Sequence, residues 1–265
     1  VFRGGNIGKR DANEAFADAI RAAIKSDGFQ LLFQPIVALK GEDGEQFQAL
    51  LRLRSDNGKL YTAAEIVPFA ESHGLIGDVD RWVLSRSMMV LAERERQKRP
   101  VRLFVSQAIE AAGDPQRAGW IRQMLETRRV SGERLVIEFR VSDALAHLRD
   151  LADFAAAVRK LGIAVSLAGF EGGAAAFQLL DRVKIDFVKV GPRYVEEGSK
   201  DPARRQELQS LVATAHERGC DVIAPRIEDA RAAAWLWTAG IDYIQGDFVQ
   251  KAGQDLNYDF HASTH

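Results

Sequence analysis

The sequence is poor in cysteine and histidine, the residues that form disulfides and that bind metals through sulfur or nitrogen. It has one cysteine, Cys220, so no disulfide can form within the chain, and this favours a reducing, cytoplasmic setting. Its five histidines show no ligand spacing. No apolar run reaches the roughly 20 residues of a membrane span, so membrane insertion is not expected. The net charge of -1 argues against general binding of nucleic acid polymers or anionic membranes.

What the sequence does have is a large apolar fraction, 46% of 265 residues, which suffices for a large core. We expect three parts: an N-terminal linker and helix at 1–28, one folded domain at 29–252, and a C-terminal tail at 253–265. The sequence starts at Val1 rather than methionine, and we expect it to belong to a longer protein.

Short apolar runs alternate with helical patterns from residue 33 onward, which predicts a parallel sheet with helical crossovers. Eight strands in about 230 residues match an α/β fold of the closed (β/α)₈ TIM-like type. A loop of about nine residues joins the first two strands, too short for a crossover, so this pair is predicted to be antiparallel. The alternative is an open, doubly wound sheet. The expected strands are 33–37, 48–53, 101–106, 135–139, 163–167, 187–190, 221–224 and 243–245, and the expected helices are 11–25, 62–72, 78–96, 113–127, 142–161, 174–180, 204–219 and 229–239.

Polar side chains interrupt these apolar strands where the strands end. Arg52 lies in an apolar run, and a buried charge without a partner costs several kcal/mol, so this position predicts an anion site. In a (β/α)₈ barrel the functional site lies at the carboxyl ends of the strands. Glu138, Lys189 and Gln245 fall at such ends, with Gln34 on the reversed first strand. We therefore expect a ligand pocket there.

The same stretches resemble the EAL domain family over about residues 29–250. Five segments are similar to family motifs, in the family's order: FQPIV at 33–37, QALLRL at 48–53, IVPFAESHGLIGDVDRWVL at 66–84, VKIDFVKV at 183–190 and YIQGDFVQ at 243–250. The resemblance implies a barrel with an antiparallel first strand. It also implies the fold of cyclic di-GMP phosphodiesterases, which hold two divalent metals in a cage of carboxylates and one asparagine.

Several positions depart from the cage that the resemblance implies. Glu138 and Glu228 are retained, but most of the family's metal ligands fall on residues that supply no charged oxygen, which hard cations require. We therefore expect no metal, no cofactor and no hydrolysis. The substituted positions are Gln48, Ser106, Ala168, Gly169, Gly191 and Pro225.

The positions that hold nucleotide in the family persist. An arginine donates paired hydrogen bonds to phosphate or to a guanine edge, and a carboxylate accepts hydrogen bonds from guanine N–H groups. An aromatic ring stacks on a base. Neutral cage positions also remove repulsion from the ligand's phosphates, so the resemblance implies metal-independent binding. The expected cyclic di-GMP contacts are Gln34, Leu50, Leu51, Arg52, Asp80, Arg226, Gln245 and Phe248.

The sequence thus predicts a catalytically inactive, degenerate EAL domain that acts as a cyclic di-GMP receptor. Its combination of motifs is similar to the FimX type, which implies signalling to a PilZ-type protein in type IV pilus biogenesis and twitching motility. The sequence leaves open whether the domain forms a homodimer. The alternatives are a metal-dependent phosphodiesterase with an altered site and a scaffold that binds no nucleotide.

Plainer readings exist for three of these residues. Arg52 could form a structural ion pair with Glu138. Asp80 could be a first-turn helix carboxylate favoured by the helix dipole. Lys189 is expected to be a remnant that pairs with Glu138.

Overall fold

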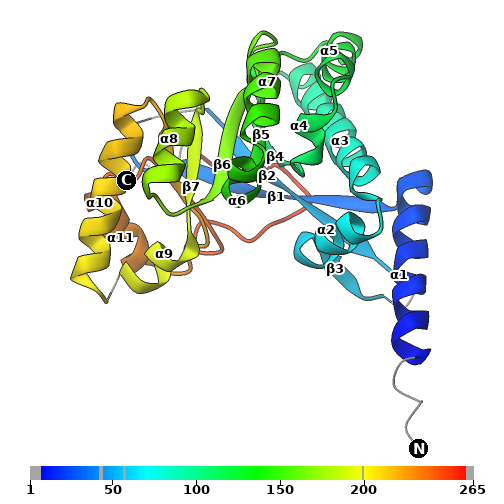
Figure 1. Ribbon diagram of the computed structural model, residues 1–265, viewed down its shortest axis with the longest axis horizontal. Coiled ribbons are helices and arrows are strands. Elements are labelled where there is room, and N and C mark those ends of the chain that lie inside the picture. Colours follow the sequence, from blue (N-terminus) through cyan, green and yellow to red (C-terminus); the bar gives the residue numbers. More distant parts are fainter. Residues whose placement is uncertain (1–6, 42–43, 56–57, 199, 261–265) are drawn as a thin grey trace, which may run out of the picture.

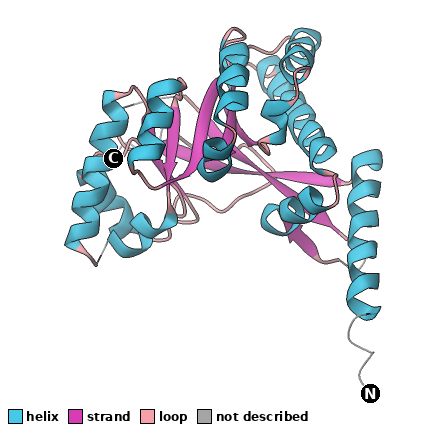
Figure 2. Ribbon diagram, viewed as in Figure 1, coloured by secondary structure: helices cyan, strands magenta, loops and turns pink. Residues whose placement is uncertain are grey.

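The fold is a closed barrel in which helices surround a central sheet (Figures 1 and 2). The structure, a computed structural model, describes residues 7–41, 44–55, 58–198 and 200–260. The strand order is β1-β9-β8-β7-β6-β5-β4-β2-β3, and pairing of β1 with β2 closes the ring and leaves β3 outside it. The strands are β1 (Phe29–Ala38), β2 (Gln46–Arg54), β3 (Leu60–Thr62), β4 (Arg102–Ser106), β5 (Leu135–Arg140), β6 (Ala164–Phe170), β7 (Phe187–Val190), β8 (Asp221–Ala224) and β9 (Tyr243–Gln245).

Helices follow most of the parallel strands and cover the outside of the barrel (Figure 2). They bury apolar residues against the outer faces of the strands, so the main core lies between the two layers. The helices are α1 (Ile7–Ser26), α2 (Ala63–Ser72), α3 (Ile76–Arg96), α4 (Glu110–Gly113), α5 (Arg117–Arg128), α6 (Val141–Ala146), α7 (Leu148–Arg159), α8 (Ala174–Arg182), α9 (Pro192–Gly198), α10 (Pro202–Glu217) and α11 (Ala230–Thr238), with a 3₁₀ turn η1 (Gly132–Arg134) before β5.

The first strand runs against all the others in the ring. β1 pairs antiparallel with β2 and with β9, whereas the other neighbouring pairs in the ring are parallel. The prediction of a (β/α)₈ barrel with an antiparallel first strand is confirmed, and the open sheet is wrong. The reversal follows from chain length, because the short hairpin loop returns the chain beside β1 without a crossover.

Several boundaries differ from the sequence-based expectation. The short strand β3 and helix α9 were not predicted. The expected helix 142–161 is two helices that meet at His147, and the expected helix 113–127 begins only at Arg117, as α5, after the separate short helix α4. Helical periodicity in the sequence does not register such breaks.

The inside of the barrel is built in two levels. The level further from the mouth is apolar, and its side chains come from β1, β4, β5, β7, β8 and β9 and pack as a small separate cluster. Because side chains alternate along a strand, the residue two positions further on points inward again, nearer the carboxyl end. In β4 and β5 these next residues are Ser106 and Glu138, which are paired in register. The apolar level contains Ile36, Phe104, Val136, Phe187, Ile223 and Tyr243.

Both ends of the described chain pack against the barrel. On α1, Ile20 is fully buried and the ring of Phe16 stacks on Tyr61 with centroids 4.3 Å apart. After β9, Gly253 bridges to Phe33 on β1. The predicted boundaries at 28/29 and 252/253 stay predictions, and residues 1–6 and 261–265 of the outer segments lie outside the described residues.

Gly132 offers a test of the packing that sets the start of β5. A Cβ at Gly132 would lie 1.9 Å from the backbone oxygen of Leu161, whereas a Cβ at Gly119, within α5, meets no atom within 4 Å. We expect Gly132→Ala to lower the free energy of unfolding by at least about 2 kcal/mol through strain. Gly119→Ala should raise it by about 0.5–1 kcal/mol through helix propensity. Urea denaturation measures both, and equal effects would contradict this account.

Candidate functional site

The candidate site is the mouth of the barrel at the carboxyl ends of the parallel strands. Helices α2, α6 and α9 lie around this mouth, on the lower side of the barrel in Figure 1. The side chains there form the polar level, which lies nearer the mouth than the apolar interior cluster. Three groups of contacts make up the mouth: a central ion pair, a group on β2 and α3, and a group on β1 and β9.

The centre of the mouth is an ion pair between Lys189 on β7 and Glu138 on β5. The Nζ–Oε2 distance is 2.9 Å, and both side chains are 6% exposed. Ser106 donates to Glu138 Oε1 at 2.9 Å and Ser166 donates to Oε2 at 3.2 Å. Each carboxylate oxygen therefore has a partner. A buried carboxylate must be satisfied in this way, because leaving it unpaired costs several kcal/mol.

Gln48 on β2 completes this centre as a neutral bridge. Its Oε1 accepts a hydrogen bond from Lys189, and its Nε2 donates to Ser106 at 3.2 Å. An amide offers both a donor and an acceptor, which a carboxylate does not. Gln48 therefore joins the ammonium of Lys189 to the serine on β4 without adding charge. We call the set of Gln48, Ser106, Glu138, Ser166 and Lys189 the central polar network.

The strand ends beside the central polar network carry no acidic ligand. Ala168 and Gly169 lie near the end of β6 and have no side-chain oxygen. At Gly191, just after β7, a Cβ would lie 2.6 Å from the Oε1 of Glu171, so the glutamate occupies the space of a larger side chain. Within the described residues, no group of three or more His, Cys, Asp or Glu could hold a metal ion.

Arg52, the predicted phosphate-binding residue, lies on β2. Arg52 is half-buried, its Nη1 donates to the Leu51 carbonyl at 2.8 Å, and burial lowers its guanidinium pKa. The alternative pairing of Arg52 with Glu138 is not found, since Glu138 contacts Lys189. Leu50 is half-buried on the same strand face as Arg52. Leu51 points the other way into the main core, so its backbone rather than its side chain is on the mouth side.

Asp80 lies on α3 and is 5% exposed. Its Oδ2 accepts a hydrogen bond from the backbone nitrogen of Ala108 at 2.9 Å, which ties α3 to the loop after β4. Burial raises the Asp80 pKa to about 7, against the Ala108 hydrogen bond and the charge of Arg117. The reading of Asp80 as a first-turn carboxylate is wrong, because it is the fifth residue of α3 and bonds outside the helix.

Gln34 and Gln245 meet across β1 and β9. Gln245 Nε2 donates to Gln34 Oε1 at 2.9 Å, and Gln34 Nε2 donates to Asp247 Oδ1 at 3.1 Å. The Oε1 of Gln245 is buried without a partner among the described residues. The two glutamines therefore form one hydrogen-bonded group, in line with their joint assignment to the site.

Phe248 follows β9 and is 45% exposed. Its backbone nitrogen donates to the carbonyl of Ile227 at 2.9 Å, which holds it beside the loop after β8. Gly246 makes this contact feasible, because a Cβ there would lie 2.2 Å from the Ile227 nitrogen. Phe248 thus presents an open aromatic face from a fixed backbone.

Arg226 lies on the same loop and has a left-handed backbone, with φ of 60°. It lines a cavity of about 750 Å³ that also involves Arg205, Arg231 and Trp235, between α9, α10 and α11. Within the part of the chain that the structure describes, no hydrogen bond joins Arg226 to β1 or β2. Arg226 is thus the predicted site residue that lines this cavity, on the loop that also holds the backbone of Phe248.

Sequence reasoning did not select three residues that the mouth uses. Ser166 and Asp247 bind Glu138 and Gln34, and Gln107 Nε2 donates to the Asp80 carbonyl at 3.2 Å. Alternation along β6 could have indicated that Ser166 faces inward. For Asp247 and Gln107, both in loops, no sequence pattern gives the direction of the side chain.

A barrel with a reversed first strand and a polar mouth of this kind defines a class, and comparison with known proteins identifies it. The sequence model of the EAL domain family matches residues 17–252. The chain therefore belongs to the EAL domain family. The EAL domain of FimX from Xanthomonas citri, solved in complex with c-di-GMP, is 30% identical with a TM-score of 0.90, covering 96% of this chain and all of that one.

Longer relatives contain this domain as one part. A 76.5 kDa protein of Thiocystis violacea is 29% identical over 97% of this chain and 37% of its own length. Cyclic di-GMP phosphodiesterase PdeF of Escherichia coli is 22% identical over 89% of this chain and 32% of its own length. The chain thus spans about a third of the relatives that it matches. Within the described residues, no helix combines the length and apolarity needed to cross a bilayer.

The central ion pair can be tested by a double-mutant cycle. Lys189→Met leaves Glu138 buried without its cation, and we expect a loss of about 3 kcal/mol in the free energy of unfolding. The double variant Lys189→Met/Glu138→Gln should recover most of that loss, because the uncompensated charge is gone. Urea denaturation measures all four proteins. Additive effects of the two substitutions would show that the pair does not act as a unit.

Asp80 predicts a pH-dependent stability. Its folded-state pKa of about 7 lies above the ordinary value of 3.8, so the folded protein keeps the proton longer than the unfolded chain. Wild-type stability therefore falls as pH rises from about 4 to 7. Asp80→Asn removes this cost, and we expect it to gain roughly 2–4 kcal/mol over wild type at pH 8 but little at pH 4. Thermal unfolding of both proteins at pH 4 and pH 8 measures this gain. A stability difference between Asp80→Asn and wild type that is the same at both pH values would contradict the prediction.

Proposed function

We propose that this domain is a cyclic di-GMP receptor that binds the nucleotide without metal and does not hydrolyse it. The observation that carries the proposal is the pairing of Glu138 with Lys189 at the centre of a mouth that keeps Arg52 and Asp80. The carboxylate that would begin a metal cage is already neutralised by a fixed cation. Likeness to the FimX EAL domain bound to c-di-GMP supports the choice of ligand.

The residues at the mouth do not fit two divalent cations. Such ions need several charged oxygen ligands, and the two-metal mechanism holds them about 4 Å apart. Here the amide of Gln48 replaces one carboxylate, and Ala168 and Gly169 supply no side-chain ligand. The ammonium of Lys189 lies 2.9 Å from Glu138, where it would repel a dication. These residues therefore do not support a two-metal mechanism at the mouth.

The proposed ligand contacts divide by chemistry. Arg52 binds phosphate or a guanine edge through its paired donors, while ionised Asp80 accepts from guanine N–H groups. Phe248 offers a stacking face, and the group formed by Gln34 and Gln245 supplies further polar contacts. Leu50 adds apolar contact with a base. The Leu51 backbone and Arg226 complete the proposed set.

The wider role follows from the same likeness. We propose a cytoplasmic signalling function in which the bound domain contacts a PilZ-type protein, in type IV pilus biogenesis and twitching motility. Because relatives are about three times longer, this domain would act as the nucleotide-sensing part of a larger chain. The second candidate is a phosphodiesterase like PdeF, which the retained Glu138 and Lys189 would favour if a metal displaced the ammonium.

Calorimetry with cyclic di-GMP in EDTA tests the receptor proposal. We expect a dissociation constant in the micromolar range or tighter, about -8 kcal/mol, and the same value with Mg²⁺ or Mn²⁺ in place of EDTA. Chromatography of the nucleotide after incubation with either metal should show no linear product. Metal-dependent turnover would instead establish the phosphodiesterase, and absence of binding would leave a scaffold.

The role of Arg52 has a matched control on the same strand. Arg52→Ala should weaken binding at least tenfold, about 1.4 kcal/mol, because the guanidinium donors are lost. Arg54 is exposed and its Nη1 donates to the carbonyl of Gly58 at 3.4 Å, so Arg54→Ala should bind within about twofold of wild type. Titration of both variants by calorimetry distinguishes the two arginines. Equal affinities for wild type and Arg52→Ala would make Arg52 structural.

A further inference from the structure

Gln34 and Gln245 form a hydrogen-bonded group at the mouth, and one atom of this group lacks a partner. Gln245 is 7% exposed, and its Oε1 is buried without a hydrogen-bond donor among the described residues. A buried carbonyl oxygen without a donor destabilises the fold. Other contacts must therefore hold the Gln245 amide in this orientation.

The pairing of β1 with β9 shows which residue faces the group. The register pairs Ile36 with Gln245, and the side chains of such a pair point to the same face of the sheet. Ile36 belongs to the apolar interior cluster, so Gln245 also points into the barrel. Gln34 lies two residues before Ile36 on the reversed strand, and the same register continued past β9 puts it opposite Asp247. Asp247 therefore faces Gln34 across the two strands.

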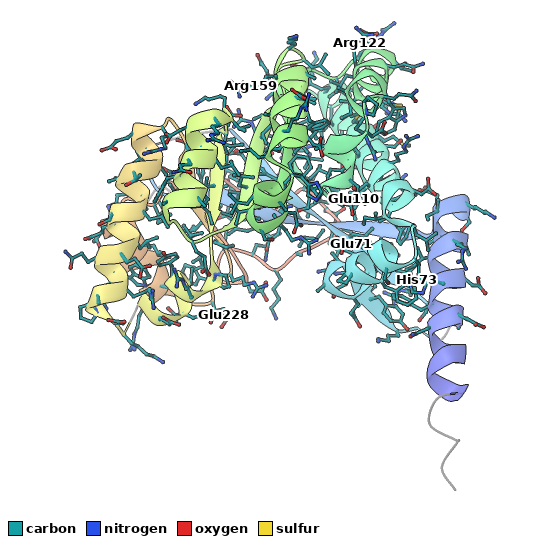
Figure 3. The ribbon with its side chains drawn as sticks, viewed as in Figure 1. Glu71, His73, Glu110, Arg122, Arg159 and Glu228 are labelled. Atoms are coloured by element: carbon teal, nitrogen blue, oxygen red, sulfur yellow. The ribbon has the colours of Figure 1, made fainter. Side chains whose placement is uncertain are left out.

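The backbone around Asp247 is fixed by the loop after β8. The Ile227 nitrogen donates to the Gln245 carbonyl at 2.9 Å, and the Phe248 nitrogen donates to the Ile227 carbonyl at 2.9 Å. Figure 3 shows Glu228, the next residue of that loop, on the lower side of the barrel, where the mouth opens. Asp247 is thus held at the mouth by its neighbours on both sides, although the residue itself is exposed.

The direction of each hydrogen bond in the group follows from the acceptors around Gln34. Its Nε2 donates to Asp247 Oδ1 at 3.1 Å and to the Gln250 carbonyl at 3.3 Å. A carboxylate and a carbonyl are acceptors only, so the Gln34 amide must turn its nitrogen toward them. The Oε1 of Gln34 then faces Gln245, whose Nε2 donates to it at 2.9 Å. Because Gln245 uses its nitrogen here, its carbonyl oxygen is the end without a partner in the described part of the chain.

We propose that Asp247 is a positioning residue that sets the direction of both amides, so that this side of the mouth presents hydrogen-bond acceptors to the ligand. The inference rests on the proposed function, because it names the ligand groups that this side of the site takes. Both donor hydrogens of the Gln34 Nε2 are already used. The bond to the carboxylate is the shorter and, being charge-assisted, the stronger of the two.

An acceptor surface of this kind selects donor groups of the ligand. Phosphate oxygens offer no hydrogen and are repelled by the Asp247 carboxylate, which leaves the phosphates to Arg52 on β2. The donors that project from the base and the sugar of cyclic di-GMP are the guanine N2 amino group and the ribose 2′-hydroxyl. One of these two groups is taken here. A donor that reaches Gln245 Oε1 also satisfies the unpaired buried acceptor.

Two substitutions of Asp247 separate its acceptor oxygen from its charge. We expect Asp247→Ala to weaken cyclic di-GMP binding about fivefold in calorimetry, the effect of about one hydrogen bond. Asp247→Asn keeps an oxygen that can accept from Gln34 and should recover most of that loss. Asp255→Ala, which removes another exposed aspartate after β9, should bind within about twofold of wild type. Equal affinities for wild type and Asp247→Ala would overturn the inference.

Two ligand analogues identify the donor group. Cyclic di-IMP lacks the N2 amino group, and 2′-deoxy cyclic di-GMP lacks the hydroxyls. For each analogue, the dissociation constant is divided by that of cyclic di-GMP, with wild type and with Asp247→Ala. A ratio that falls in the variant for cyclic di-IMP assigns the acceptors to the base, and a fall for the deoxy analogue assigns them to the ribose. If neither ratio changes, Asp247 does not set the polarity of this side.

A ligand-free measurement distinguishes failure of this inference from failure of the proposed function. The side-chain amide ¹H–¹⁵N resonances of Gln34 and Gln245, assigned by their loss in Gln34→Met and Gln245→Met, can be recorded without nucleotide. Both should shift in Asp247→Ala, because a change at one amide passes to the next, and neither should shift in Asp255→Ala. If wild type binds no cyclic di-GMP but both resonances shift, the receptor proposal fails and the orienting action of Asp247 stands. A shift of the Gln34 resonance alone rejects that action on Gln245.

Discussion

The ion pair between Lys189 and Glu138 is the interaction on which the mouth of this barrel depends. Both groups lie directly above an apolar interior, where neither can be solvated by bulk water. Their charges must therefore be compensated within the protein. The two serines and Gln48 supply the remaining hydrogen bonds, and together they connect β2, β4, β5, β6 and β7 at one level.

This arrangement changes what the EAL barrel can do at its centre. A lysine ammonium is fixed by its covalent stem and carries one charge, whereas the two-metal mechanism needs exchangeable divalent ions with open positions. In the proposed receptor, the groups that would bind the ligand lie on the surrounding rim: Arg52 on β2, Asp80 on α3, and the glutamine pair on β1 and β9. A receptor requires only that rim.

On this rim, the ionised form of Asp80 is held at a cost in stability. Burial and the charges of Glu71 and Glu110 disfavour the ionised form of Asp80, while the Ala108 N–H and the charge of Arg117 favour it. Groups held at such a cost are common at binding sites, where stability is exchanged for a charged acceptor that is in place before the ligand arrives.

Much of the fold could be predicted from the sequence, since the alternation of apolar runs with helical patterns defines the strand order in a parallel barrel. The short loop between the first two strands likewise defined their antiparallel pairing. The strand β3, the helix α9 and the break at His147 could not be predicted. Such short elements and breaks leave no periodic signal in the sequence.

For the site, the sequence indicated that Glu138 and Lys189 lie at strand ends and pair with each other, and the structure confirms that pair. Only the tertiary structure excluded the alternative pairing of Glu138 with Arg52 and showed that Gln48 joins Lys189 to Ser106. Only the structure placed the Asp80 carboxylate against the backbone N–H of Ala108. The physical reason is that strand alternation fixes the direction of a side chain, whereas the partner of a charge depends on packing between elements far apart in the chain.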